Sequence, residues 1–125
     1  MEYIAVDGLT LAPQGIVSIG AGALVITSVP SIKVKAGGKG VYKTPLTFTL
    51  AGANATGYDP GTVVTVGSGS MPATAAKCKA DGILVMREND QVVGVTMTGT
   101  IGGTPTPFVE TWKITSAGQT KVRAE

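Results

Sequence analysis

Apolar and polar residues alternate along most of this chain, and alternation is typical of β-strands that bury one face. The clearest strand covers 46–50, where Leu46, Phe48 and Leu50 share one face. Similar runs, bounded by Gly, Pro, Asn or Asp, predict strands at 16–19, 23–27, 62–66, 92–98 and 108–114. A buried helix competes over the apolar run 16–29, but its glycines and β-branched residues favour strands.

The segments between these strands predict turns and loops. The segment 3–11 alternates around Asp7-Gly8 and predicts a two-residue hairpin. Gly20-Ala21-Gly22 predicts a turn. The Gly- and Pro-rich segments 51–61, 67–72 and 102–107 predict loops, and the second of these has the composition of a flexible one. The polar segment 115–125 predicts either a last strand or a mobile tail.

One stretch occurs twice. The segment 33–43 recurs 44 residues later as 77–87, and five of the eleven positions are identical. Each copy alternates, reaches Gly37-Gly38 or Asp81-Gly82, and then alternates again, which is the pattern of a β-hairpin with a two-residue turn. The sequence therefore predicts an internal repeat of hairpins near 31–44 and 75–88, turning on Gly37, Gly38, Asp81 and Gly82.

Pairing each copy across its turn places the same kind of residue on the same face. Val34 lies opposite Val41 in the first copy, and Cys78 lies opposite Val85 in the second. Lys33, Lys35, Lys77 and Lys79 take the other face, where we expect solvated edge lysines that block unwanted strand pairing or, alternatively, contacts to an acidic partner. Cys78 is expected to be a small core residue rather than a reactive thiol.

Composition agrees with one all-β domain covering 1–125: a small Gly-rich domain of repeated hairpins, cone-like or sandwich-like in shape. Charged residues make up only 14% of the chain, and it contains 18 glycines. The scarcity of Leu, Glu, Lys and Gln disfavours a helical bundle. The net charge of +2 gives no electrostatic case for nucleic acid, and an acidic residue near Met1 disfavours a signal peptide.

Candidate chemistry is sparse. The absence of histidine removes the commonest general base and most zinc sites, so we expect no catalytic, cofactor or metal site and no enzymatic activity. Glu88 and Asp90 are an acid pair in principle, but turn residues after a strand are the better interpretation. Phe108 and Trp112 are expected in the core rather than on a binding surface.

The segments 31–41 and 75–90 resemble the proline-alanine-alanine-arginine repeat (PAAR) family and its PAAR-like relatives, over roughly residues 28 to 92. In that family, short Gly-turn hairpins form a small cone on the trimeric spike of contractile injection machines. The naming motif is altered here, because the nearest match, 71–77, has an insertion and ends in Lys77 instead of arginine. The zinc that three His and one Cys hold in metal-binding members is not expected, since this chain has no histidine.

The resemblance implies a structural spike-tip protein, made in the cytoplasm without a signal peptide and exported on contraction as part of a phage tail, type VI secretion system or extracellular injection particle. Its implied partners are a trimeric β-helical spike, optional effector cargo and, transiently, the target membrane. The alternative is a β-sandwich binding or adhesion module of a virion or surface assembly, with 51–61 and 102–107 as recognition loops.

Overall fold

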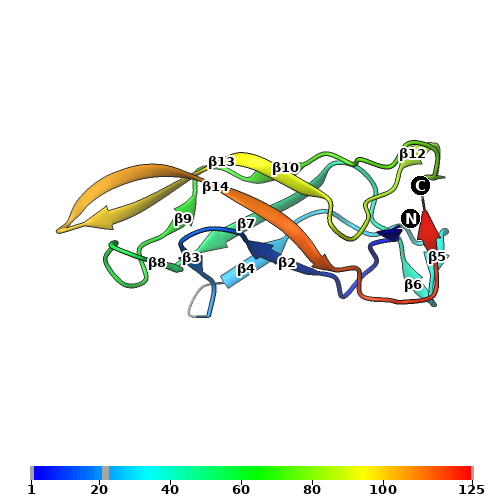
Figure 1. Cartoon of the computed structure of the whole chain (residues 1–125), viewed down its shortest axis with the longest axis horizontal. Helices are drawn as coiled ribbons and strands as arrows, with labels where there is room; N and C mark the ends of the chain where they lie inside the picture. Colours follow the sequence, from blue (N-terminus) through cyan, green and yellow to red (C-terminus); the bar gives the residue numbers. More distant parts are fainter. Residues whose placement is uncertain (1, 21–22, 125) are drawn as a thin grey trace.

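The computed structural model describes residues 2–20 and 23–124, and the secondary structure of these residues consists of β-strands, which confirms the all-β prediction (Figure 1). No helix in this part of the chain is long and apolar enough to cross a membrane. In chain order the strands are β1 (Glu2–Tyr3), β2 (Thr10–Pro13), β3 (Val17–Ser18), β4 (Ala23–Ile26), β5 (Lys35–Ala36), β6 (Lys39–Gly40), β7 (Leu46–Ala51), β8 (Asn54–Ala55), β9 (Val64–Thr65), β10 (Gly69–Met71), β11 (Lys79–Ala80), β12 (Ile83–Leu84), β13 (Gln91–Ile101), β14 (Thr104–Ser116) and β15 (Arg123–Ala124).

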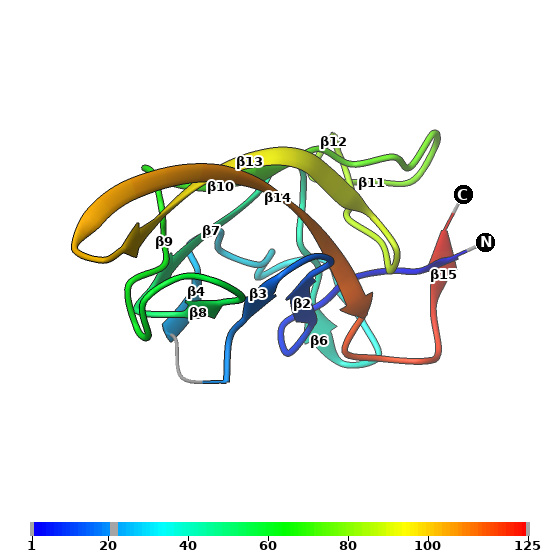
Figure 2. The ribbon, with the colours of Figure 1, turned by 60° about the vertical axis from the view of Figure 1, so that its left-hand side comes forward.

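Two antiparallel sheets form the body of the molecule. One has the strand order β2-β14-β13-β9 and the other β10-β7-β4. Figure 2 shows the long, curved β13–β14 pair arching over the second sheet. The short pairs β5-β6, β11-β12 and β1-β15 lie together at the opposite end of the molecule from the β13–β14 turn, beside both chain ends (Figure 1).

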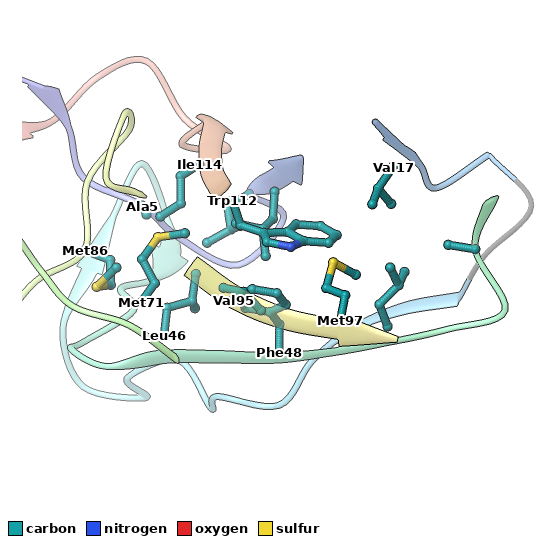
Figure 3. Close-up of a cluster of buried hydrophobic side chains, with 14 of the residues drawn as sticks. Ala5, Val17, Leu46, Phe48, Met71, Met86, Val95, Met97, Trp112 and Ile114 are labelled. Atoms are coloured by element: carbon teal, nitrogen blue, oxygen red, sulfur yellow. The ribbon is translucent and has the colours of Figure 1, made fainter. Parts of the chain in front are cut away.

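The main core fills the space between the two sheets (Figure 3). Phe48 of β7 and Trp112 of β14 are both fully buried, and their ring centroids are 5.0 Å apart. The alternating strand 46–50 therefore buries the face that its sequence predicts. Trp112 is a core residue, as expected, and Phe108 packs half-buried against the same cluster.

The prediction of a flexible loop at 67–72 is wrong, because this segment contains β10, which pairs with β7. Met71 is fully buried, and Gly69 lies directly against the ring of Phe48. A Cβ atom on Gly69 would stand 2.3 Å from Phe48 Cζ, so the glycine here makes room for an aromatic ring. Its Gly-Ser composition suggested a flexible loop, but Gly69 serves packing.

The predicted loop at 102–107 is also wrong beyond its first two residues. Gly102 and Gly103 form the turn, with φ angles of +56° and +83°, and β14 begins at Thr104. Pro105 and Pro107 are accommodated because this part of β14 pairs only with β13, and β2 joins β14 further along, from Trp112 onward.

The predicted N-terminal hairpin at 3–11 does not form. Asp7-Gly8 is a tight turn in which the Leu9 N–H donates to the Val6 carbonyl, but the strands on either side pair elsewhere. β1 pairs with β15 and β2 pairs with β14, so partners distant in sequence replace the local one.

The remaining differences are in strand length. The predicted strand at 16–19 shortens to β3, that at 62–66 shortens to β9, and the predicted loop at 51–61 contains β8, which pairs with β3. The strand predicted at 23–27 is β4. The predicted turn Gly20-Ala21-Gly22 includes residues 21 and 22, which lie outside the described residues.

We expect Gly82→Val to destabilise the protein by about 1–2 kcal/mol, because Gly82 has a φ of +80° and a β-branched residue is strained there. No heavy atom outside the adjoining residues lies within 4 Å of a Cβ built at this position, so the cost is conformational rather than steric. Urea denaturation measures the change. Gly82→Asn is the control and should cost less, since Asn tolerates this conformation; equal stability of the Val variant and the unsubstituted protein would contradict the assignment of the turn.

Candidate functional site: three hairpins around one axis

Both copies of the repeated segment form the hairpins that the sequence predicts. Gly37 and Gly38 have positive φ angles, as do Asp81 and Gly82. Lys35 pairs with Gly40 in the first hairpin, and Lys79 pairs with Leu84 in the second, so the predicted registers are confirmed. We call these units hairpin 1 (33–43) and hairpin 2 (77–87).

The apolar faces of the two hairpins meet in a second, smaller core. Its buried residues come from both hairpins, from the N-terminal segment and from the residues just before hairpin 2: Ile4, Val6, Ala36, Val41, Ala75, Ala80 and Val85. Val34 and Cys78 pack half-buried against them. Val34 and Cys78 occupy equivalent places, and this confirms that Cys78 is a packing residue. The N-terminal residues in this cluster are a contribution that the repeat did not predict.

A closed ring of backbone hydrogen bonds lies under this small core. The Ala5 N–H donates to the Met86 carbonyl at 2.9 Å, the Met86 N–H donates to the Tyr42 carbonyl at 2.9 Å, and the Tyr42 N–H donates to the Ala5 carbonyl at 3.0 Å. Each of three segments therefore gives one hydrogen bond and accepts one. We call the three segments 4–6, 41–43 and 85–87 the central ring.

Further backbone contacts between the three segments repeat with the same threefold relation. The three segments are joined cyclically by the isolated bridges Ile4↔Arg87, Val6↔Val41 and Lys43↔Val85. A second set of equivalent bonds runs from the residue after each segment to the residue before its neighbour: Asp7 N–H to Gly40, Thr44 N–H to Leu84 and Glu88 N–H to Tyr3. Three unrelated side-chain sets thus share one backbone arrangement around an approximate threefold axis.

The third unit is a hairpin split between the two ends of the chain. The Ile4 N–H donates to the Val122 carbonyl at 3.0 Å, which matches the bonds from Val41 to Val34 and from Val85 to Cys78, each 3.1 Å. β1 and β15 then pair in the register Glu2↔Ala124 and Tyr3↔Arg123. We call this unit the split hairpin (121–124 with 2–6); the last-strand prediction for 115–125 is confirmed over β15.

The sequence contains a signal for the split hairpin, but this signal does not have the form of a local hairpin. Lys121-Val122-Arg123-Ala124 stands 44 residues after Lys77-Cys78-Lys79-Ala80, the same offset that separates the first two copies. Because only the leading strand of the third copy lies there, it does not look like a hairpin. Its second strand lies at the other end of the chain.

Exposed cations lie along the first strand, or leading strand, of each unit, which contains β5, β11 or β15. Lys33, Lys35, Lys77 and Lys79 point away from the small core and are exposed, as the alternation predicts. Lys121 and Arg123 are exposed at the equivalent positions of the split hairpin. All Lys and Arg residues of the chain except Lys113 lie in the three units, so this end of the molecule, the hairpin end, is its basic end.

The turn of hairpin 2 is tied to hairpin 1 by a shared carboxylate. Asp81 Oδ2 accepts from the Ser31 hydroxyl at 3.0 Å and from Lys43 Nζ at 3.1 Å. These two hydrogen bonds, that of Lys43 foremost, hold the pKa of the Asp81 carboxyl below its ordinary value. The turn of hairpin 1 lies against the residues just before the split hairpin in an equivalent way. A Cβ atom built on Gly37 would stand 3.0 Å from Cβ of Gln119.

The acidic pair considered for catalysis is used by the structure. Asp90 is buried and accepts from the Arg87 N–H and the Thr74 hydroxyl, whereas Glu88 accepts from the Ala117 N–H. The intervening Asn89 has a φ of +72°, so Glu88 and Asp90 are turn residues, as expected. Among the described residues, no group of three His, Cys, Asp or Glu side chains is placed to hold a metal ion.

Comparison of the chain with protein-family models, with curated proteins and with solved structures finds no match.

If the split hairpin is a true third copy, a circular permutant should fold. The permutant begins at Gly38 and ends at Gly37, with Ala124 and Glu2 joined by Asp-Gly, the turn of hairpin 2. We expect a cooperative thermal transition in circular dichroism, with a melting temperature above that of a matched permutant joined by Val-Val. Failure of both permutants to fold would show that the two ends do not form an equivalent turn.

Asp81→Asn should lower stability at neutral pH and lose its effect in acid. A carboxyl whose pKa is lowered in the folded state contributes stability above its ordinary value of 3.8, and this contribution disappears as the pH falls through the folded-state pKa. The gap in melting temperature between the two proteins should therefore close below pH 3.8. Asp7→Asn, the same change at an exposed carboxylate outside hairpin 2, is the control. A gap that is constant from pH 7 to pH 2 would contradict this role.

Proposed function

We propose that this protein caps the trimeric β-helical spike of a contractile injection apparatus, such as a phage tail, a type VI secretion system or an extracellular injection particle. The observation that carries the proposal is the approximate threefold axis of the hairpin end, built by a single chain. One cap on a trimer must present three similar contact surfaces to three identical subunits. A monomeric β-sandwich module has no comparable need for such an axis.

The hairpin end supports docking by strand addition. Each leading strand pairs with its partner on one side and belongs to a two-stranded sheet, and in the described part of the chain no further strand pairs with its outer edge. Three open edges related by the threefold axis match three strands at the blunt end of a β-helical trimer. The cations Lys33, Lys77 and Lys121 stand at equivalent places beside these edges and are candidate partner contacts.

If the hairpin end docks on the spike, the opposite end of the molecule points away from it. In Figure 1 the β13–β14 hairpin projects from the body at the end opposite the hairpin end, and its tip, the narrow end, is the turn at Gly102-Gly103. In this proposal the narrow end points away from the spike, meets the target membrane transiently and concentrates the force of contraction. The role is mechanical and assigns no catalytic residue; effector cargo is an optional addition.

The alternative is a β-sandwich binding or adhesion module, which the two-sheet body with its common core favours. Of the two loops assigned to recognition in that alternative, 102–107 is mostly strand. The threefold hairpin end therefore favours the cap.

The test is co-purification with a candidate trimeric β-helical spike protein from the same genome, followed by native mass spectrometry. We expect a complex of one cap and three spike subunits. Charge reversal at Lys33, Lys77 or Lys121 should weaken the complex by similar factors of about two to five each, because the three sites are equivalent and exposed. Lys113→Glu, the same change on β14, should leave binding unchanged.

A monomer that ignores the spike and binds a glycan would overturn the proposal in favour of the adhesion module. Loss of binding on reversal at only one of the three lysines would contradict threefold docking.

A further inference from the structure

Part of the threefold arrangement continues into the body. Each of the three units is followed by two strands of the body sheets: hairpin 1 by β7 and β10, hairpin 2 by β13 and β14, and the split hairpin by β2 and β4. Strands of neighbouring units pair across two of the three unit boundaries, β4 with β7 and β14 with β2, whereas at the third boundary β13 pairs with β9 instead of β10. The body therefore contains three equivalent strand pairs without forming a closed cycle.

The third pair is open where the other two are closed. β7 pairs with β10 and β13 pairs with β14, whereas β2 and β4 do not pair and are the edge strands of their sheets. In hairpin 1's unit, Leu46 pairs with Met71. Leu46 is four residues after Tyr42 of the central ring, and Met71 is six residues before Lys77, the first lysine of the next unit. At the same offsets, the third unit has Leu9, four residues after Ala5, and Thr27, six residues before Lys33. Leu9 and Thr27 do not pair with each other.

A groove of about 460 Å³ occupies this position. Its lining comes from β2 (Thr10 and Leu11), from β4 (Leu24 and Ile26), from the segment 7–9 before β2, from Ile19 and from Tyr42 of the central ring. Ile19, Leu24 and Ile26 are only partly buried against the main core. The groove thus has an apolar floor.

Unpaired backbone groups face the groove from both sides. The Thr27 N–H donates to Thr47 on β7, so the alternation of an antiparallel ladder turns the backbone groups of Leu24 and Ile26 away from β7, to the free edge. The Gln14 N–H donates to Thr111 on β14, so the backbone groups of Leu11 likewise face the free edge of β2.

The charge of the groove defines one end of its occupant. Asp7 is the charged residue of the lining and stands at the end of the groove beside Tyr42. Burial, and then the Asp7 carboxylate, raise the pKa of the Tyr42 hydroxyl, so it stays protonated at neutral pH and can donate a hydrogen bond. An occupant with a cation at this end is complementary.

We infer that the groove between β2 and β4 binds an extended peptide segment of another protein, with alternating apolar side chains and a basic residue at the Asp7 end. The peptide completes the third strand pair by hydrogen-bonding to both free edges. A lipid or other apolar ligand would fill the floor but leave the edge N–H and C=O groups of Leu11, Leu24 and Ile26 unpaired. The groove shares Tyr42 with hairpin 1 but contains none of the lysines proposed to contact the spike, so the inference does not depend on the proposed spike contact.

The test uses two synthetic peptides, acetyl-Lys-Thr-Val-Thr-Val-Thr-Val-amide and its reversed sequence, because the direction of the bound strand is open. We expect one of them to shift the amide resonances of Leu11, Leu24 and Ile26 and to slow their hydrogen exchange. Ile26→Pro removes an N–H that faces the groove and no ladder hydrogen bond, so it should weaken binding about tenfold. Val25→Thr, on the outer face of β4, is the matched control and should bind normally.

A second test keeps the inference falsifiable if Ile26→Pro does not fold. Asp7→Asn should weaken binding of the Lys peptide by about two- to fivefold and leave the matching Gln peptide unaffected. Absence of shifts at the three amides with either peptide would overturn the inference. Binding of an apolar probe such as a fatty acid in place of both peptides would reassign the groove to an apolar ligand.

Discussion

The ring of three backbone hydrogen bonds among Ala5, Tyr42 and Met86 is the constraint on which the rest of the structure depends. Each segment uses its donor on one neighbour and its acceptor on the other, so no segment can leave without breaking bonds to both. The side chains of Tyr42 and Met86 then point into the main core, while those beside them, Val41 and Val85, enter the small core. Two hydrophobic cores are joined through one set of backbone bonds.

Because the ring is made by backbone groups, the side chains around it are free to differ. Ala5, Tyr42 and Met86 have little in common, yet they occupy equivalent places. This freedom lets a single chain keep a threefold end while its body departs from threefold symmetry. The body departs from it at β2 and β4, which do not pair with each other, and at β13, which pairs with β9 instead of β10.

The sequence predicted the local features well and the distant ones poorly. The turns at Gly37-Gly38 and Asp81-Gly82, the opposed Val34 and Val41, and the buried face of 46–50 follow from the φ requirement of tight turns and from alternation. The pairing of β1 with β15 does not follow from local pattern, since the two strands are far apart in sequence and only the 44-residue offset of 121–124 points to it. The Gly-rich β10 was misassigned because a glycine that makes room for Phe48 looks the same in sequence as a glycine in a linker.

The split hairpin also shapes the order of folding. Segment 4–6 needs Val122 and Ala117 for its own hydrogen bonds, so a ribosome that has made only the first hundred residues has not yet supplied these partners. Contacts this distant in sequence slow folding, since the chain must close a long loop before they contribute. Hairpins 1 and 2 can form early, but the threefold end is completed only after segment 117–124 has been made, because segment 4–6 bonds to it. Until then the backbone groups of segment 4–6 that bond to Ala117 and Val122 have no partner there, so a growing chain holds a half-built ring.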